Sequence, residues 1–240
     1  MASWVNRGQG MRKQGTGTLT WDGCGKKPCR RGLPLFAFMT DAGRTPDPAK
    51  ALRLLVPGTV VIFRHYDAPD RAVLGRRLAA LARRLGLIFV VAADRRLARR
   101  LRADGLHLPD GMVRRRYRFA PKGDPWPVSA AAHDGPGLRR AVRAGVDLVL
   151  LSPVFPTASH PGRPALGVHI LAALCRGSAV PVLALGGVAP ESLRRVLGAG
   201  AAGVAGIGAL PHLCRDPFGL RAARPCTAWS RRLAHGRDMV

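Results

Sequence analysis

The sequence predicts a single (β/α)8 barrel, and three observations carry that prediction. Short apolar runs alternate with stretches rich in Arg, Ala and Leu at a period of roughly 20 to 30 residues, as repeated strand–helix units do. Eight apolar runs lie between residues 33 and 210, the number of strands that closes such a barrel. The alternative α/β fold, a doubly wound sheet, is less favoured because no G-x-G-x-x-G fingerprint opens the first unit.

Each predicted strand is an apolar run bounded by turn-forming or charged residues, which is typical of a strand buried in a parallel sheet. The runs are residues 35–39, 60–63, 88–92, 105–108, 128–131, 148–151, 182–185 and 203–207. Helices are predicted where apolar residues recur at i, i+3 and i+4, in residues 49–55, 71–85, 95–102, 138–144, 169–175 and 191–197. Residues 110–126 are polar and Arg-rich, and they predict a loop with at most a short helix.

The two ends of the chain differ from this pattern. Residues 1–32 are rich in Gly, Lys, Arg and Thr without hydrophobic periodicity, and they predict a disordered basic extension. Residues 211–240 mix Cys, Arg, Pro and Trp, and they predict an irregular tail. The barrel is therefore expected to occupy residues 33–210.

The composition narrows the classes of partner. The 240 residues carry a formal net charge of +25, and aromatic residues make up only 5%. Most arginines have the spacing of solvated helix faces, and no basic stripe is interleaved with aromatic residues, so specific nucleic-acid binding is not predicted. A field this positive attracts phosphorylated small molecules, and nucleic acid without specificity.

The cysteines and the apolar runs predict a cytoplasmic protein without a membrane anchor. Five cysteines are scattered, and only Cys24 and Cys29 lie close together, without a second ligand pair at zinc spacing. Free thiols in a reducing compartment are the simplest interpretation. No apolar run approaches the ~20 residues that cross a bilayer, and the first residues lack the apolar core of a signal peptide.

Polar residues recur directly after the predicted strands. In a barrel these positions converge at the carboxyl ends of the strands, where active sites lie. Four of the seven histidines follow strand ends, which favours an enzyme over a scatter of surface residues. The strand-end residues are Asp41, Arg64, His65, Tyr66, Asp67, Asp94, His107, Asp110, His133, Thr157, Ser159, His160, Gly186, Gly187 and Gly208.

The stretch from Val146 to Gly162 holds the most informative of these loops. An apolar strand ends in Ser152-Pro153, and a Pro-rich loop follows with Thr157, Ser159 and His160. Two hydroxyls beside a titratable imidazole suit ligand binding or proton transfer. The alternative is a surface turn that is stiffened by its prolines and whose polar residues are only exposed to solvent.

Glycines after the last two strands predict the ligand. Gly186-Gly187 follows the seventh strand, and Gly206-Ile207-Gly208 closes the eighth. Backbone N–H groups can approach a ligand closely there, and the loops after strands seven and eight commonly hold phosphate in this fold. A phosphorylated substrate is expected, although Gly186-Gly187 taken alone is equally explained as a tight turn.

Several segments, in matching order over residues 35–210, resemble a known family. The chain contains MTD, DGLHL, SPVFPTASHPG and VPVLALGGVAPESLRRVLGAGAAGVAGIGAL, which are similar to segments of thiamine phosphate synthase and the related thiazole tautomerase. The resemblance implies a (β/α)8 enzyme that joins an aminopyrimidine methyl diphosphate to a thiazole phosphate. Pyrophosphate is released, and Mg²⁺ assists.

The resemblance also implies roles for individual residues. Arg64 matches the arginine that holds the diphosphate, and Asp94 matches the first magnesium aspartate. Substrate-binding positions are implied at Tyr66, Ser129, Thr157, Ser159, Gly186, Gly187, Ile207 and Gly208.

Four departures from the family pattern predict a weakened magnesium site and weaker stabilisation of the leaving group. Tyr66 and His160 replace lysines, Ala93 replaces an asparagine, and Pro109-Asp110-Gly111 replaces the box that holds the second metal aspartate. His160 is expected to replace the lysine charge in part, and Asp110 to reach the metal through water.

Two other functions stay open. A thiazole phosphate tautomerase needs a general base and no metal, and His133 stands where that base is expected. A non-catalytic protein that binds a phosphorylated ligand would keep Arg64 and the glycines and lose the chemistry.

Overall fold

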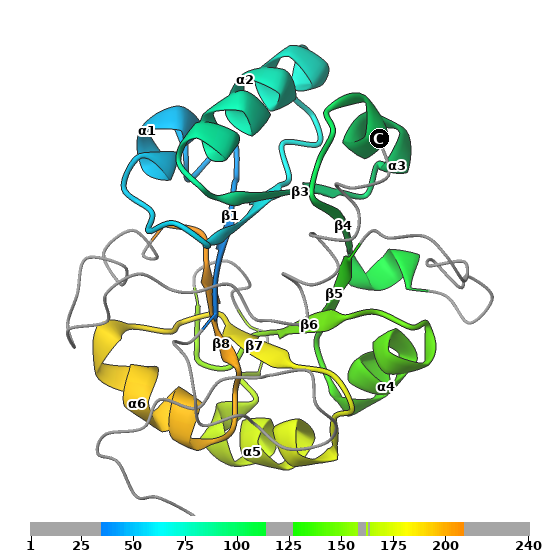
Figure 1. The fold of residues 1–240 in the computed structure, drawn as a ribbon. Helices are drawn as coiled ribbons and strands as arrows, with labels where there is room; N and C mark the ends of the chain where they lie inside the picture. Colours follow the sequence, from blue (N-terminus) through cyan, green and yellow to red (C-terminus); the bar gives the residue numbers. More distant parts are fainter. Residues whose placement is uncertain (1–34, 114–126, 158–161, 163, 209–240) are drawn as a thin grey trace, which may run out of the picture.

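The computed structural model describes residues 35–113, 127–157, 162 and 164–208, and they form a closed, all-parallel barrel in which β1 pairs with β8 (Figure 1). The predicted fold is confirmed. The terminal segments 1–32 and 211–240, with their predicted disorder and irregular structure, lie outside the described residues. The strands are β1 (Leu35–Met39), β2 (Val60–Phe63), β3 (Ile88–Ala92), β4 (Gly105–Leu108), β5 (Val128–Ala132), β6 (Leu148–Leu151), β7 (Val182–Leu185) and β8 (Gly203–Gly206).

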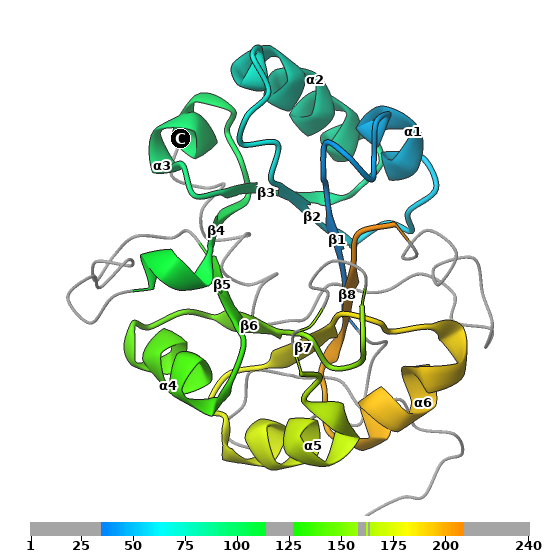
Figure 2. The same cartoon turned by 180° about the vertical axis from the view of Figure 1, so that it is seen from behind.

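Helices surround the barrel in the order of the chain, as both views show (Figures 1 and 2). They are α1 (Pro48–Leu52), α2 (Arg71–Arg84), α3 (Arg95–Arg100), α4 (Gly135–Arg143), α5 (Gly167–Gly177) and α6 (Pro190–Gly198). A single 3-10 turn, η1 (Asp110–Met112), follows β4, where the sequence predicts at most a short helix.

Side-chain capping fixes where several helices begin. The carboxylates of Asp47, Asp94 and Asp134 accept hydrogen bonds from backbone N–H groups in the first turns of α1, α3 and α4. Helix α4 therefore begins at Gly135, three residues before the apolar pattern predicts, with Pro136 in its first turn.

Alternation along the strands divides the core into two layers. Phe36, Phe38 and Phe63 point outward and pack under the helices in the larger cluster of buried residues. Ala37, Ile62 and similar residues point inward and fill the barrel in a second cluster. Strands buried on both faces lose the apolar–polar alternation, so their sequences are continuous apolar runs.

Candidate functional site

A cavity of about 480 Å³ opens at the carboxyl ends of the strands. Its described lining contains two arginines and no carboxylate, so the cavity is cationic. The lining residues are Arg44, Arg64, Ser152, Pro153, Thr157, Leu185, Gly186, Gly187, Val188, Ala205, Gly206, Ile207 and Gly208. Six predicted site residues are thereby brought together: Arg64, Thr157, Gly186, Gly187, Ile207 and Gly208.

A larger hollow of about 700 Å³ lies among residues of α1, α2 and the loop before α1. It contains none of the predicted site residues.

Gly186 and Gly187 seat the loop after β7 against the loop after β6. Both have positive φ, at 91° and 64°, where other residues are strained. A Cβ on Gly186 would lie 2.9 Å from Pro153 Cα, and one on Gly187 would lie 2.5 Å from the Pro156 carbonyl oxygen. Close packing of the two loops therefore requires this Gly-Gly pair, and the role of the pair toward a ligand stays a prediction.

Gly208 differs, because a Cβ there would meet no atom within 4 Å. Gly208 also lines the cavity. A ligand group can approach the backbone at this point, which fits the expected phosphate position.

Arg64 follows β2 and is anchored through its backbone. Its N–H donates to Thr40 Oγ1 at 3.0 Å, and the same hydroxyl lies 2.9 Å from Nδ1 of the buried His65. The guanidinium carbon of Arg64 lies 6.0 Å from the centre of the Tyr66 ring. That ring also lies 5.4 Å from the guanidinium carbon of Arg71. Tyr66 thus contacts two cations at the position where the family resemblance implies a lysine.

Arg44 lines the same cavity and was missed by sequence reasoning. The Asp41 carboxylate accepts hydrogen bonds from the N–H groups of Gly43 and Arg44, both at 3.1 Å, and thereby shapes the loop after β1. The sequence feature that could have pointed to Arg44 is Asp41, a strand-end residue three positions before it. Its role is to turn the loop that presents Arg44.

Ser129 lies inside the barrel beside a buried histidine. Its side chain is fully buried, and its Oγ lies 3.0 Å from Nδ1 of His107 on the neighbouring strand. Burial lowers the pKa of His107 to about 3, and the nearby positive charge of Arg64 adds to this effect. Ser129 does not line the cavity, and its role toward substrate stays a prediction.

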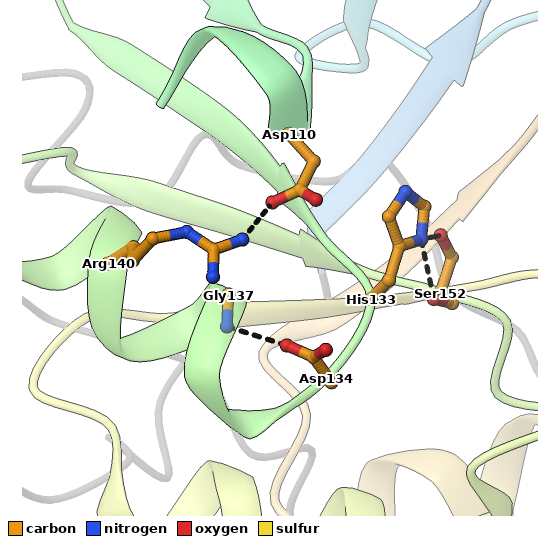
Figure 3. Close-up of polar contacts among 6 residues, drawn as sticks. All are labelled: Asp110, His133, Asp134, Gly137, Arg140 and Ser152. Atoms are coloured by element: carbon orange, nitrogen blue, oxygen red, sulfur yellow. Dashed lines mark hydrogen bonds and ion pairs between the residues drawn. The ribbon is translucent and has the colours of Figure 1, made fainter. Parts of the chain in front are cut away.

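The two carboxylates expected to hold magnesium have other partners. Asp94 Oδ1 accepts from the Leu97 N–H at 2.8 Å and caps α3, and its Oδ2 lies 3.6 Å from Nη1 of Arg71. Asp110 accepts from Nη2 of Arg140 at 2.9 Å (Figure 3). Within the described part of the chain no three His, Cys, Asp or Glu side chains form a group that could hold a metal. These residues, as they stand, do not fit a resident Mg²⁺ ion.

His133 directly follows β5, as predicted, and contacts the cavity wall. Its Nδ1 lies 2.9 Å from the Ser152 carbonyl oxygen and 3.2 Å from Ser152 Oγ (Figure 3). A carbonyl accepts only, so Nδ1 carries the proton and donates to it. The neutral ring then has its basic lone pair on Nε2, the form that a general base needs.

Ser159 and His160 lie outside the described residues, so their predicted roles stay predictions. Four further predicted site residues do not line the cavity: Tyr66, Asp94, Asp110 and His133. No helix in the described ranges is long and apolar enough to cross a membrane.

Together these features define a (β/α)8-barrel protein with a cationic, glycine-lined cavity at the carboxyl ends of its strands. The chain belongs to the family described as thiamine monophosphate synthase, whose model matches residues 37–210. The resemblance inferred from the sequence is confirmed.

Individual relatives agree with this assignment. The chain is 27% identical over 194 residues to a thiamine-phosphate synthase of Bacillus velezensis, covering 77% of this chain and 86% of the relative. It is 29% identical over 197 residues to a thiamine-phosphate synthase of Bacillus mycoides, covering 77% of this chain and 88% of the relative. In fold it is similar to a thiamine phosphate pyrophosphorylase from Pyrococcus furiosus, with a TM-score of 0.63, 24% identity, and coverage of 84% of this chain and 96% of that one.

Proposed function

We propose that the chain is a transferase of thiamine biosynthesis that couples an aminopyrimidine methyl diphosphate to a thiazole phosphate. The observation that carries the proposal is the cavity, in which Arg64, Thr157 and the glycines after β7 and β8 meet. Family membership supports the reaction class. A cytoplasmic location, expected from the cysteines, belongs to the same proposal.

The chemistry of this coupling is a substitution at carbon. The C–O bond to the diphosphate breaks, and the pyrophosphate leaves with the electron pair. The thiazole nitrogen then donates its lone pair and forms the C–N bond. Catalysis consists mainly of stabilising the charge that develops on the leaving group. Arg64 is the residue we assign to that task, and the backbone beside Gly208 is assigned to the thiazole phosphate. Because the Asp94 and Asp110 carboxylates are engaged, Mg²⁺ has no step in this proposal.

A coupling assay tests the proposal. The full-length protein is incubated with both substrates, and formation of thiamine phosphate and release of pyrophosphate are measured together. Equal amounts of the two products, lost in Arg64→Ala, are the expected result. Binding of thiazole phosphate without any turnover would instead favour a non-catalytic binding protein.

A second candidate function is tautomerisation of a thiazole phosphate, and one observation favours it. The Ser152 carbonyl accepts from Nδ1 of His133, which leaves Nε2 as the nitrogen that could act as a base, and Ser152 itself lines the cavity. Such a base can remove a proton from carbon without a metal. Exchange of substrate protons in deuterium oxide, lost in His133→Asn while thiazole phosphate still binds, would identify this activity. No exchange by the wild type would exclude it.

A further inference from the structure

The first observation is that the two carboxylates expected to hold magnesium, which follow β3 and β4, each lie beside an arginine. Arg71 places Nη1 3.6 Å from Asp94 and donates from Nη2 to the Ala92 carbonyl at 2.8 Å, so its guanidinium is held at the end of β3. Asp94 also caps α3 through its other oxygen. A divalent ion at Asp94 would have to compete with the positive charge of Arg71 for Oδ2, the oxygen that the helix cap does not use.

The carboxylate in the next strand–helix unit, Asp110 after β4, also lies beside an arginine. Asp110 accepts from Arg140 at 2.9 Å, a short, charge-assisted hydrogen bond between side chains that are 30% and 39% exposed. Neither Asp94 nor Asp110 lines the cavity. Carboxylate oxygens are the protein ligands that Mg²⁺ prefers, and these two are directed toward guanidinium groups.

The second observation is that the cavity supplies positive charge directly. Arg44 and Arg64 line it from the loops after β1 and β2, and its described lining contains no Asp or Glu. In the described structure Arg64 forms no ion pair with a carboxylate. Guanidinium groups bind phosphate oxygens with paired N–H donors and need no metal to bridge the charges.

We propose that Arg44 and Arg64 hold the phosphate groups of the ligand directly and that this chain binds them without a divalent cation. The proposal rests on the proposed function only for the choice of a phosphorylated ligand. Arg44 is the residue that neither the sequence motifs nor the family resemblance brings to the site.

Isothermal titration of the full chain with inorganic pyrophosphate tests the proposal, once with excess EDTA and once with excess Mg²⁺. We expect the affinity in EDTA to equal or exceed that in Mg²⁺, because Mg²⁺ competes for free pyrophosphate. Arg44→Gln and Arg64→Gln should each weaken binding in EDTA by roughly tenfold, the loss of one charge-assisted contact. Arg64→Lys should recover part of the loss, and it also controls for misfolding.

Matched controls separate the site from the general positive charge of the surface. Arg53→Gln removes an exposed arginine on the C-terminal side of α1, outside the cavity, and should leave the affinity unchanged. Asp94→Asn keeps a side-chain oxygen for the cap but removes the charge, and it should not weaken pyrophosphate binding in Mg²⁺.

Three results would overturn the proposal. They are binding that EDTA abolishes and Mg²⁺ restores, loss of Mg²⁺-dependent binding in Asp94→Asn, and equal weakening by Arg53→Gln and Arg44→Gln. Failure of the coupling reaction alone would count against the proposed function and leave direct pyrophosphate binding intact.

Discussion

Mild acid should destabilise this barrel through His107, whose side chain is buried inside it. Burial, and secondarily the charge of Arg64, lower the pKa of this imidazole from 6.5 to about 3. The unfolded chain therefore takes up a proton as the pH falls below about 6.5, while the native protein does not until about pH 3. The stability that the neutral imidazole provides is lost progressively over that window. Between pH 7 and pH 5 the loss amounts to about 2 kcal/mol.

Urea unfolding followed by far-UV circular dichroism at pH 7 and pH 5 measures this loss. The matched variant is His107→Leu combined with Ser129→Ala, which removes the imidazole without leaving the Ser129 hydroxyl unpaired. His65, whose pKa burial also lowers, is present in both proteins, so its contribution cancels. The loss of stability between the two pH values should be smaller by about 2 kcal/mol in the double variant. Equal losses in both proteins would refute the assignment to His107.

Three further substitutions have expected outcomes that thermal unfolding can check. Ala93 has a φ of 65°, in the region that asparagine tolerates better, so Ala93→Asn should stabilise the protein by roughly 0.5–1 kcal/mol; a lower melting temperature would contradict this. Gly187→Ala should destabilise by at least about 2 kcal/mol, because its Cβ would meet the Pro156 carbonyl; an unchanged melting temperature would mean that the loop yields. Asp134→Ala removes the acceptor of the Gly137 N–H and should cost about 1 kcal/mol, whereas Asp134→Asn should cost less.

The barrel could be predicted from the sequence because its strands are buried on both faces. Each is a continuous apolar run, and the predicted limits of six strands agree with the structure. Strand β5 extends one residue further, to Ala132, and β8 ends one residue earlier, at Gly206, since pairing with the neighbouring strand decides these limits. Helix α4 begins early because a cap, rather than its apolar face, determines its first residue.

Site residues could be predicted where their position after a strand places them at the cavity. They could not be predicted where a contact with a side chain from another unit decides their role. Arg64 directly follows β2, and Thr157 lies in the loop after β6. Both therefore line the cavity at the carboxyl ends of the strands. The ion pair of Asp94 could not be predicted, because Arg71 is the first residue of a helix in the preceding unit. Arg44 was overlooked because nothing in its local sequence distinguishes it from the many other arginines.

The two ion pairs after β3 and β4 are built in a similar way, and this bears on the role of their carboxylates. Arg71 begins α2 and reaches Asp94 after β3, and Arg140 in α4 reaches back to Asp110 after β4. Each pair therefore links two successive strand–helix units at the carboxyl ends of the strands. Both pairs are partly exposed, so each contributes at most about 1 kcal/mol to stability. Their effect is mainly positional, because each carboxylate is held toward a guanidinium on the neighbouring unit, and neither carboxylate lines the cavity. The charged residues in the described lining of the cavity are Arg44 and Arg64.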